Sequence, residues 1–160
     1  MKKLPSPHRP RTLAPIPYVA GVDYDVLDEL VGYSLRRAQV AMFLAFHDAT
    51  RGLDITPPRF TALVIVGANP GVSQTLLGET LGIARSGAMM LTDWMQASGF
   101  VERRRRPDDG RAWGLHLTTR GEALVKRMKR RVLEEEQRRT ARLGAGNHRK
   151  LVGLLKKLAG

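Results

Sequence analysis

The sequence predicts a mostly helical fold with one small β-hairpin, and three observations support this prediction. Apolar residues recur at helical spacing on both sides of the middle of the chain. Glycine and proline divide these helical stretches, most clearly at Asn69-Pro70-Gly71. Residues 107–110 read Pro-Asp-Asp-Gly, which is typical of a hairpin turn, and apolar residues alternate in 113–117 directly after it.

The first long helix is expected from Tyr24 to about Thr50, with Asp23 as its N-cap. This stretch contains a single glycine and no proline, and Asp25 and Asp28 suit the positive end of the helix dipole. A helix of this length spans about 40 Å, which is more than a small domain needs for its own core. We therefore expect part of it to pair with another subunit.

Residues 1–20 are predicted to form a flexible, basic, proline-rich N-terminal arm. Its sequence is compatible with contact to DNA, contact to a partner subunit, or a purely solubilising role. The prolines interrupt any signal-peptide core, and no apolar run in the chain is long enough to span a bilayer. We therefore expect a cytoplasmic protein with no membrane partner.

Three short helices and a two-stranded wing are expected between residues 56 and 118. Thr56-Pro57 begins the first helix, Ser73 caps the second, and the third runs from about Arg85 to Ser98. The second and third are joined by a tight corner at Gly82, which matches the outline of a helix-turn-helix motif.

Two further helices are expected after the wing. Thr119 and Glu122 have capping-box spacing and begin the first of them, with Glu134–Arg138 and Glu135–Arg139 as supporting pairs. The last helix has a broad apolar stripe, which must be covered by the first helix or by a second copy of the chain. This stripe comprises Leu151, Val152, Leu154, Leu155 and Leu158.

The charge of the chain favours a polyanionic partner. Lys and Arg total 27 against 15 Asp and Glu, a formal net charge of +12. Four arginines follow one another at 103–106, beside the predicted turn. A solvated surface is the usual explanation of such a run, but on a wing strand we expect it to contact DNA.

Catalysis is not expected, because the sequence contains no nucleophile elbow, phosphate-binding loop or HExxH motif. The absence of cysteine excludes disulfides, thiolate metal ligands and cysteine-based redox sensing. The four histidines show no pair at metal-ligand spacing. We therefore predict no catalytic site, no metal site and no cofactor.

The order of these elements resembles the MarR family of transcriptional regulators over residues 24–159. The resemblance is sharpest in 77–121, where Leu-x-x-x-Leu-Gly, Gly-apolar-Val, a run of arginines, Asp-x-Arg and Leu-Thr-x-x-Gly follow one another without a gap. The last two pieces are filled by Asp109, Arg111, Leu117, Thr118 and Gly121.

This resemblance implies a winged helix-turn-helix homodimer that binds double-stranded operator DNA, commonly as a repressor. Residues 21–160 would form one domain, with 21–55 and 119–160 as dimerisation helices and 56–118 as the DNA-binding lobe. Asp109 would shape the wing turn by pairing with a nearby arginine. The residues implied at the DNA are Ser73, Gln74, Arg85, Ser86, Met89, Met90, Arg103, Arg104, Arg105, Arg106, Asp109 and Arg111.

The expected recognition helix departs from the family pattern, because it has few side chains that form hydrogen bonds. Ala84 stands where a capping serine is common, so we expect Ser86 to cap this helix instead. Sequence specificity is then expected from Arg85, from methionine contacts to thymine methyl groups and from DNA shape.

The resemblance also implies a small-molecule inducer, either an aromatic or phenolic acid or an acyl-CoA thioester. Binding of the inducer would favour a spacing of the two lobes that no longer matches successive major grooves. Packing in the core is the alternative role of the residues that we single out on the first helix. The candidate ligand-binding residues are Tyr33, Arg36, Arg37, Phe43 and His47. A nonspecific architectural DNA-binding protein without an inducer is the alternative function.

Overall fold

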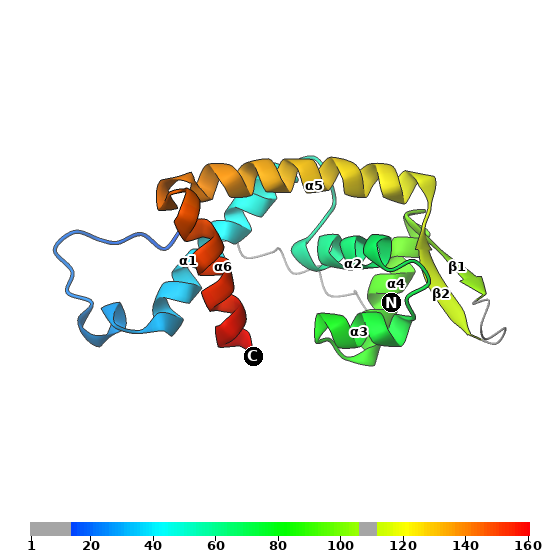
Figure 1. Ribbon diagram of the computed structural model, residues 1–160, viewed down its shortest axis with the longest axis horizontal. Coiled ribbons are helices and arrows are strands. Elements are labelled where there is room, and N and C mark those ends of the chain that lie inside the picture. Colours follow the sequence, from blue (N-terminus) through cyan, green and yellow to red (C-terminus); the bar gives the residue numbers. More distant parts are fainter. Residues whose placement is uncertain (1–13, 106–111) are drawn as a thin grey trace, which may run out of the picture. The chain divides into compact units, whose positions relative to one another are not determined.

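The described part of this computed structural model, residues 14–105 and 112–160, is mostly helical with one two-stranded hairpin, as predicted (Figure 1). The chain divides into two units, Met1–Ala45 and Phe46–Gly160, which we describe in turn. Most of the predicted arm, residues 1–13, lies outside the described part, as do residues 106–111, which include the predicted turn at 107–110.

The first unit contains the 3-10 helix η1 (Asp25–Asp28) and most of helix α1 (Val31–Ala49). The prediction that one helix runs from Tyr24 is therefore wrong at its start. Oδ1 of Asp23 accepts a hydrogen bond from the Asp25 N–H at 2.9 Å, and Asp25 has a φ of 46°. Both features favour a local turn, because a short polar side chain competes with the backbone bonds of a helix.

The second unit continues from the end of α1 into α2 (Pro57–Ala68), α3 (Gln74–Leu81) and α4 (Arg85–Ala97). The predicted starts of α2 and α3 are confirmed: Pro57 opens α2, and the Ser73 hydroxyl accepts a hydrogen bond from the Leu76 N–H at 3.1 Å. Gly82 ends α3 with a φ of 62°, a left-handed conformation that favours glycine. The predicted corner between α3 and α4 is therefore present.

Strands β1 (Val101–Arg105) and β2 (Trp113–Leu117) pair antiparallel, so that the first residue of β1 lies opposite the last residue of β2. Strand β2 also bonds to the loop after α2. The Leu115 carbonyl accepts from the Gly71 N–H at 2.8 Å, and the Leu115 N–H donates to the Val72 carbonyl at 2.9 Å. These bonds anchor the wing to the segment that leads into α3.

Helix α5 (Thr119–Thr140) has Thr118 as its N-cap, so the predicted cap at Thr119 is wrong by one residue. Oγ1 of Thr118 accepts from the Gly121 N–H at 3.1 Å and donates to the Gly99 carbonyl at 2.7 Å. A threonine one residue later could not make both bonds, because it already lies in the first turn. The Thr118 hydroxyl therefore ties the start of α5 to the turn after α4.

The later half of α5 contains a buried carboxylate, Glu135, which is 7% exposed. Its predicted pair with Arg139 is confirmed at 3.3 Å. Arg138 was expected to pair with Glu134 but binds Glu135 instead, while Glu134 lies 3.9 Å from Arg130. The hydrogen bond from Arg138, supported by Arg139, lowers the pKa of Glu135 below its usual value.

Side chains from α2, α3, α4, both strands and α5 form the core of the second unit. Their close packing sets the position of the wing against the helix-turn-helix motif, because a dense core admits few alternative arrangements. The largest fully buried apolar side chains are Leu63, Val66, Leu77, Met95, Leu115 and Met128.

The chain ends with the 3-10 turn η2 (Ala141–Leu143) and helix α6 (Ala145–Ala159). The predicted apolar stripe is present on α6 and is exposed in the single chain, with Leu154 at 53% and Leu158 at 61% exposure. This apolar surface does not make α6 a membrane helix, because no helix in residues 14–105 and 112–160 is long and apolar enough to cross a membrane.

Candidate nucleic-acid interface and an adjacent pocket

Helix α4 presents a buried side to the core and an exposed side to solvent. Ala88, Thr92 and Met95 are buried. The exposed side carries the four α4 residues that the sequence analysis placed at the DNA: Arg85, Ser86, Met89 and Met90. Met90 is 71% and Met89 is 50% exposed, so the exposed side of α4 has an apolar part as well as a basic one.

The start of α4 corrects one sequence prediction. The N-cap is Ala84, and it makes no side-chain capping bond. Ser86 lies within the first turn of the helix, so its predicted role as the cap is wrong. The chain reaches α4 through the glycine corner in an extended conformation at Ala84, which leaves Ser86 two residues too late to cap. Its hydroxyl therefore lies on the exposed side of the helix.

Close packing of α3 against α4 sets the geometry of the motif. A Cβ atom added to Gly78 would lie 2.9 Å from the Cβ of Ala88. The two helices can approach this closely because both positions hold small residues. At the start of α3, the Ser73 hydroxyl is engaged as the helix cap, and the Gln74 side chain is half-buried.

The wing arginines of the described part have partners within the chain, which the sequence pattern did not indicate. Nη2 of Arg103 donates to Oε1 of Gln74 at 3.0 Å and lies 3.7 Å from the Asp93 carboxylate. These contacts join the wing to both α3 and α4. Arg103 thus braces the motif as well as adding charge to it.

The next two arginines are engaged on the wing itself. Nε of Arg104 donates to the Glu102 carboxylate at 2.8 Å. The guanidinium of Arg105 lies over the Trp113 ring, 5.4 Å from its centroid. The remaining predicted wing residues, Arg106, Asp109 and Arg111, lie outside the described residues.

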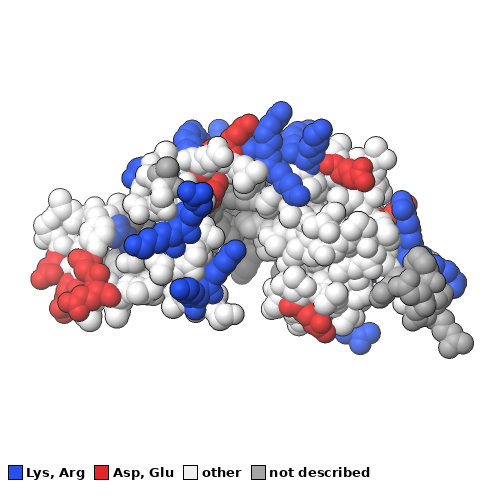
Figure 2. Space-filling model, viewed as in Figure 1, with Lys and Arg blue, Asp and Glu red and all other residues white. Residues whose placement is uncertain are grey.

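Figure 2 shows where charge gathers on the face in view. Lys and Arg side chains lie along α5 and beside the wing, and acidic side chains gather around η1. A basic wing beside an exposed helix face is the arrangement expected of a surface that binds a polyanion.

The structure brings together two of the five candidate ligand residues on α1. The Arg37 guanidinium lies 5.8 Å from the centroid of the Tyr33 ring and 3.7 Å from that of Tyr18. Its Nε also donates to the Ile16 carbonyl at 3.3 Å. Tyr18 was missed because it falls in the segment predicted to be a flexible arm.

The other three candidates, Arg36, Phe43 and His47, are exposed. We call Arg37, Tyr18 and Tyr33 the Arg37 cluster. Within residues 14–105 and 112–160, the other three candidates make no side-chain hydrogen bond, ion pair or ring contact that would join them to it. The five residues therefore do not form one group in the single chain.

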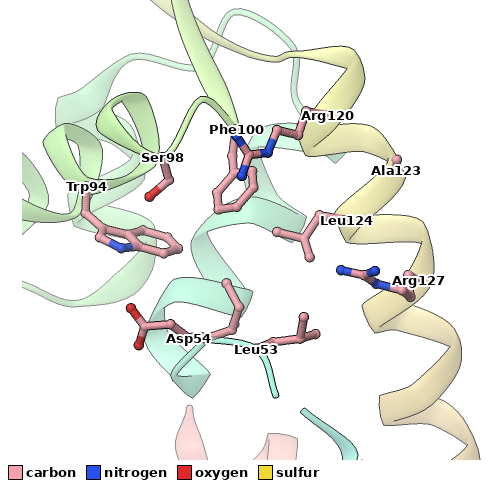
Figure 3. Close-up of a pocket in the computed structure, with 10 residues that line it drawn as sticks. Leu53, Asp54, Trp94, Ser98, Phe100, Arg120, Ala123, Leu124 and Arg127 are labelled. Carbon is pink, nitrogen blue, oxygen red and sulfur yellow. The ribbon is translucent and has the colours of Figure 1, made fainter. Parts of the chain in front are cut away.

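A pocket of about 490 Å³ opens within the second unit, between α4, the start of α5 and the loop before α2 (Figure 3). Arg59 pairs with Asp54 at its rim at 3.0 Å and lies over the Trp94 ring at 4.1 Å. The sequence analysis predicted none of its residues, because they come from three separate segments with no shared motif. The lining comprises Leu53, Asp54, Ile55, Trp94, Ser98, Phe100, Arg120, Ala123, Leu124 and Arg127.

Comparisons with known proteins identify the family. The sequence model of the MarR family matches residues 53–112. A protein of Thauera aromatica proposed as the transcriptional regulator of the hcr operon is 32% identical over 129 residues, which cover 80% of this chain and 78% of that protein. This chain belongs to the MarR family.

Solved structures of transcriptional regulators agree with this assignment. The repressor CouR bound to a 23-mer DNA duplex is 36% identical, with a TM-score of 0.81, and the match covers 87% of this chain and 99% of CouR. CouR bound to p-coumaroyl-CoA is 34% identical, with a TM-score of 0.75, covering 86% and 97% of the two chains. PcaV from Streptomyces coelicolor, in complex with its natural ligand, is 28% identical, with a TM-score of 0.73, covering 88% and 97%.

Membership of the MarR family makes this protein a DNA-binding transcriptional regulator with a winged helix-turn-helix fold. The predicted fold class and family are thereby confirmed. In this MarR protein, α3 and α4 form the helix-turn-helix motif and β1 and β2 form the wing.

Proposed function

We propose that the protein is a homodimeric repressor that binds operator DNA and releases it when an aromatic acid or its CoA thioester binds. The observation that carries this proposal is the exposed side of α4 next to an arginine-rich wing, on a lobe whose packing holds both in place. The solved structures support it, because CouR is a repressor whose structures include a DNA complex and a p-coumaroyl-CoA complex.

Helix α4 is proposed to enter the major groove. Arg85 would donate to base edges, while Met89 and Met90 would contact thymine methyl groups. With little hydrogen bonding available from the helix, the shape of the DNA would add to sequence preference. Ser73 and Gln74 at the start of α3 would lie at the phosphate backbone.

The wing is proposed to reach a neighbouring minor groove or the phosphates beside it. Arginine is favoured in a narrow minor groove because the negative potential is concentrated there. The residues in this role are Arg103, Arg104, Arg105, Arg106 and Arg111.

Exposed apolar surface supports a homodimer. Several large apolar side chains of η1 and α1 are exposed, among them Val26 at 54% and Val31 at 63%. The stripe on α6 adds further exposed apolar side chains, and clusters of such side chains mark surfaces that a partner covers. A second copy of the chain would cover these surfaces, and a symmetric dimer would place two α4 helices for successive major grooves.

The Arg37 cluster supports an acidic, aromatic inducer. A guanidinium beside the rings of Tyr18 and Tyr33 can hold a carboxylate while an aromatic group stacks on the tyrosines. Arg36, Phe43 and His47 would complete this site only if the dimer or the bound ligand brings them nearer.

Fluorescence-anisotropy titration tests the proposal. The purified protein is titrated against its own upstream intergenic DNA and against a scrambled duplex of equal length, at one salt concentration, because affinity for DNA depends steeply on salt. The titrations are repeated with aromatic acids and with their CoA thioesters. We expect tighter binding to the upstream DNA and loss of that binding with one class of compound. Equal affinity for both duplexes, unchanged by every compound, would instead show a nonspecific architectural protein.

A further inference from the structure

We propose that Met89 and Met90 on helix α4 form a reversible oxidation site, at which conversion to methionine sulfoxide lowers the affinity of the protein for operator DNA. The substrate class is a two-electron oxidant that donates an oxygen atom, such as a peroxide. The oxidation itself is argued from the exposure of the two side chains. Its effect on DNA binding rests on the proposed function, in which α4 enters the major groove.

The methionines of the chain divide by exposure. The chain contains six methionines and no cysteine. Met95 and Met128 are fully buried in the core of the second unit, and Met42 on α1 is half-buried. In the described part of the chain, the exposed methionines are Met89 at 50% and Met90 at 71%. Two adjacent thioethers on the exposed side of α4 are therefore open to a dissolved oxidant, whereas those of the core are not.

The chemistry of the thioether allows the modification to be made and removed. In a chain without cysteine, the methionine sulfur is the side-chain atom that a peroxide oxidises most readily. The sulfur loses two electrons and takes up one oxygen atom, and the hydrogen peroxide that supplies this oxygen is reduced to water. Methionine sulfoxide reductases return the sulfoxide to the thioether.

Oxidation changes the apolar part of the exposed side of α4. A sulfoxide is polar and carries a hydrogen-bond acceptor, so it loses the contact to a thymine methyl group that we propose for each thioether. Its oxygen also carries a partial negative charge, which is unfavourable close to the phosphates of the DNA. Both changes weaken the complex without altering the core of the lobe.

A sulfoxide at Met89 would also engage Arg85. The two residues are four positions apart on α4, so their side chains are neighbours on the helix surface. Arg85 makes no hydrogen bond, ion pair or ring contact with another residue of the described part, so its guanidinium can donate to the sulfoxide oxygen. A guanidinium held in this way is drawn away from the base edge that we propose it reads.

Operator DNA should protect this site. If α4 lies in the major groove, the DNA covers both exposed methionines and shields them from the oxidant. Oxidation at Met89 and Met90 should therefore be slower in the presence of the upstream duplex, while the rate at Met42 on α1 should stay the same. The oxidant would then act on the protein that is free of DNA and prevent it from binding again.

Peptide mass spectrometry after peroxide treatment tests the chemical step. The full-length protein is exposed to hydrogen peroxide for increasing times, with and without the upstream duplex, and sulfoxide is measured at each methionine. We expect Met89 and Met90 to oxidise at least about tenfold faster than Met95 and Met128, because susceptibility follows exposure. Equal rates at the exposed and the buried methionines would overturn the proposed site.

Fluorescence anisotropy with the upstream duplex tests the effect on DNA binding. We expect peroxide treatment to weaken binding by the wild type about tenfold. Treatment with methionine sulfoxide reductases should restore the affinity as sulfoxide disappears from Met89 and Met90. An affinity that does not change with peroxide, or that does not return when the two sulfoxides are reduced, would overturn the proposal.

Leucine variants provide the matched comparison. The double variant Met89→Leu with Met90→Leu has no thioether on α4 but keeps apolar side chains there, and Met42→Leu removes the half-buried methionine of α1. Each protein is compared with itself before and after peroxide, so a changed starting affinity does not enter the comparison. We expect Met42→Leu to lose affinity as the wild type does and the double variant to change less than about twofold. An equal loss in the double variant would overturn the assignment to these residues.

The Arg85→Ala variant separates this site from the proposed function. If Arg85→Ala weakens operator binding but oxidation of Met89 and Met90 does not, the oxidation switch fails and the placement of α4 on DNA is retained. If neither change affects operator binding, that placement fails and the switch fails with it. If oxidation weakens operator binding and no aromatic compound does, the switch is supported and the proposed inducer is wrong.

Discussion

The exposed side of α4 and the wing differ in the kind of contact that each residue can make. Met89 and Met90 can contact only apolar groups, so Arg85 is the one residue on this side that can donate several hydrogen bonds to a base edge. On the wing, every arginine of the described part is already held by a partner within the chain. In the proposed complex with DNA, base discrimination would therefore be concentrated at Arg85, and the wing would contribute mainly charge.

Arg85→Ala should therefore lower both the affinity and the selectivity of operator binding. Loss of a base-specific arginine contact costs about 1–3 kcal/mol in binding free energy and relaxes the preference at that base pair. Anisotropy with upstream and scrambled DNA measures both effects. Arg149→Ala, which removes an exposed arginine from α6, is the matched control. If both variants lose affinity equally for both duplexes, Arg85 acts only through its charge.

Glu102→Gln should strengthen binding to DNA, unlike most changes at a binding surface. The Glu102 carboxylate holds Arg104 and places a negative charge on the wing strand. Its removal frees a guanidinium for phosphate and removes repulsion from the backbone, so we expect a several-fold gain in affinity for any sequence. The slope of log affinity against log salt concentration should become steeper by about one released counterion. An unchanged affinity would place this part of the wing away from the DNA.

Single close contacts decide how the elements of the second unit join. Gly121 in the first turn of α5 packs directly on the chain after α4, since an added Cβ would lie 2.0 Å from the Phe100 carbonyl oxygen. Thr118 bonds to the same turn. The wing is therefore held at its base by two adjacent contacts, and its orientation depends on them.

Gly121→Ala should destabilise the protein by about 1–3 kcal/mol or more, because the backbone of either α5 or the turn must shift. The free energy of unfolding in urea measures this. Gly153→Ala on α6 is the control, since a Cβ there meets no atom within 4 Å. Alanine is the better helix former, so this second change should stabilise by about 0.5–1 kcal/mol. Equal stability of the two variants would contradict the close contact.

The buried carboxylate of α5 predicts a loss of stability in acid. The hydrogen bond from Arg138 lowers the pKa of Glu135 from its usual value of 4.5 in the folded state. Its contribution to stability is therefore present above about pH 4.5 and is lost as the pH falls through the lowered folded-state pKa. Glu135→Gln should be less stable than the wild type near neutral pH and should lose less stability on acidification. Urea unfolding at several pH values measures this difference, and parallel curves for the two proteins would contradict it.

At the scale of the whole molecule, exposed apolar surface is the feature that most needs a partner. The stripe on α6 lies open along the helix, with Leu151 at 41% and Leu154 at 53% exposure. Full burial of an exposed leucine side chain stabilises by about 1.5–3 kcal/mol, so each of these half-exposed leucines forgoes about half of that stabilisation. A homodimer that buries the stripe would also set the distance between the two α4 helices, so assembly and DNA binding should depend on the same residues.

Leu154→Asp should therefore weaken the dimer and the binding to operator DNA together. A buried, unpaired carboxylate in an apolar interface costs several kcal/mol, which is enough to dissociate a dimer at micromolar concentration. Sedimentation equilibrium gives the mass, and anisotropy gives the affinity for DNA. Arg149→Glu introduces the same kind of charge on the opposite side of α6 and should leave both unchanged. A Leu154→Asp protein that stays dimeric would remove α6 from the interface.

Local patterns in the sequence determined the elements, the corner at Gly82, the cap at Ser73 and the family. Each depends on residues a few positions apart, for which helical period, capping chemistry and turn chemistry are sufficient. The same reasoning misplaced the start of α1 and the caps of α4 and α5, because neighbouring residues offered nearly equal alternatives. Only the tertiary structure decided that Arg103 braces α3 and α4, that Tyr18 joins Arg37, and that Arg127 faces a pocket with Trp94. Such contacts join segments far apart in the chain, and their geometry follows from how the core packs rather than from any spacing along the sequence.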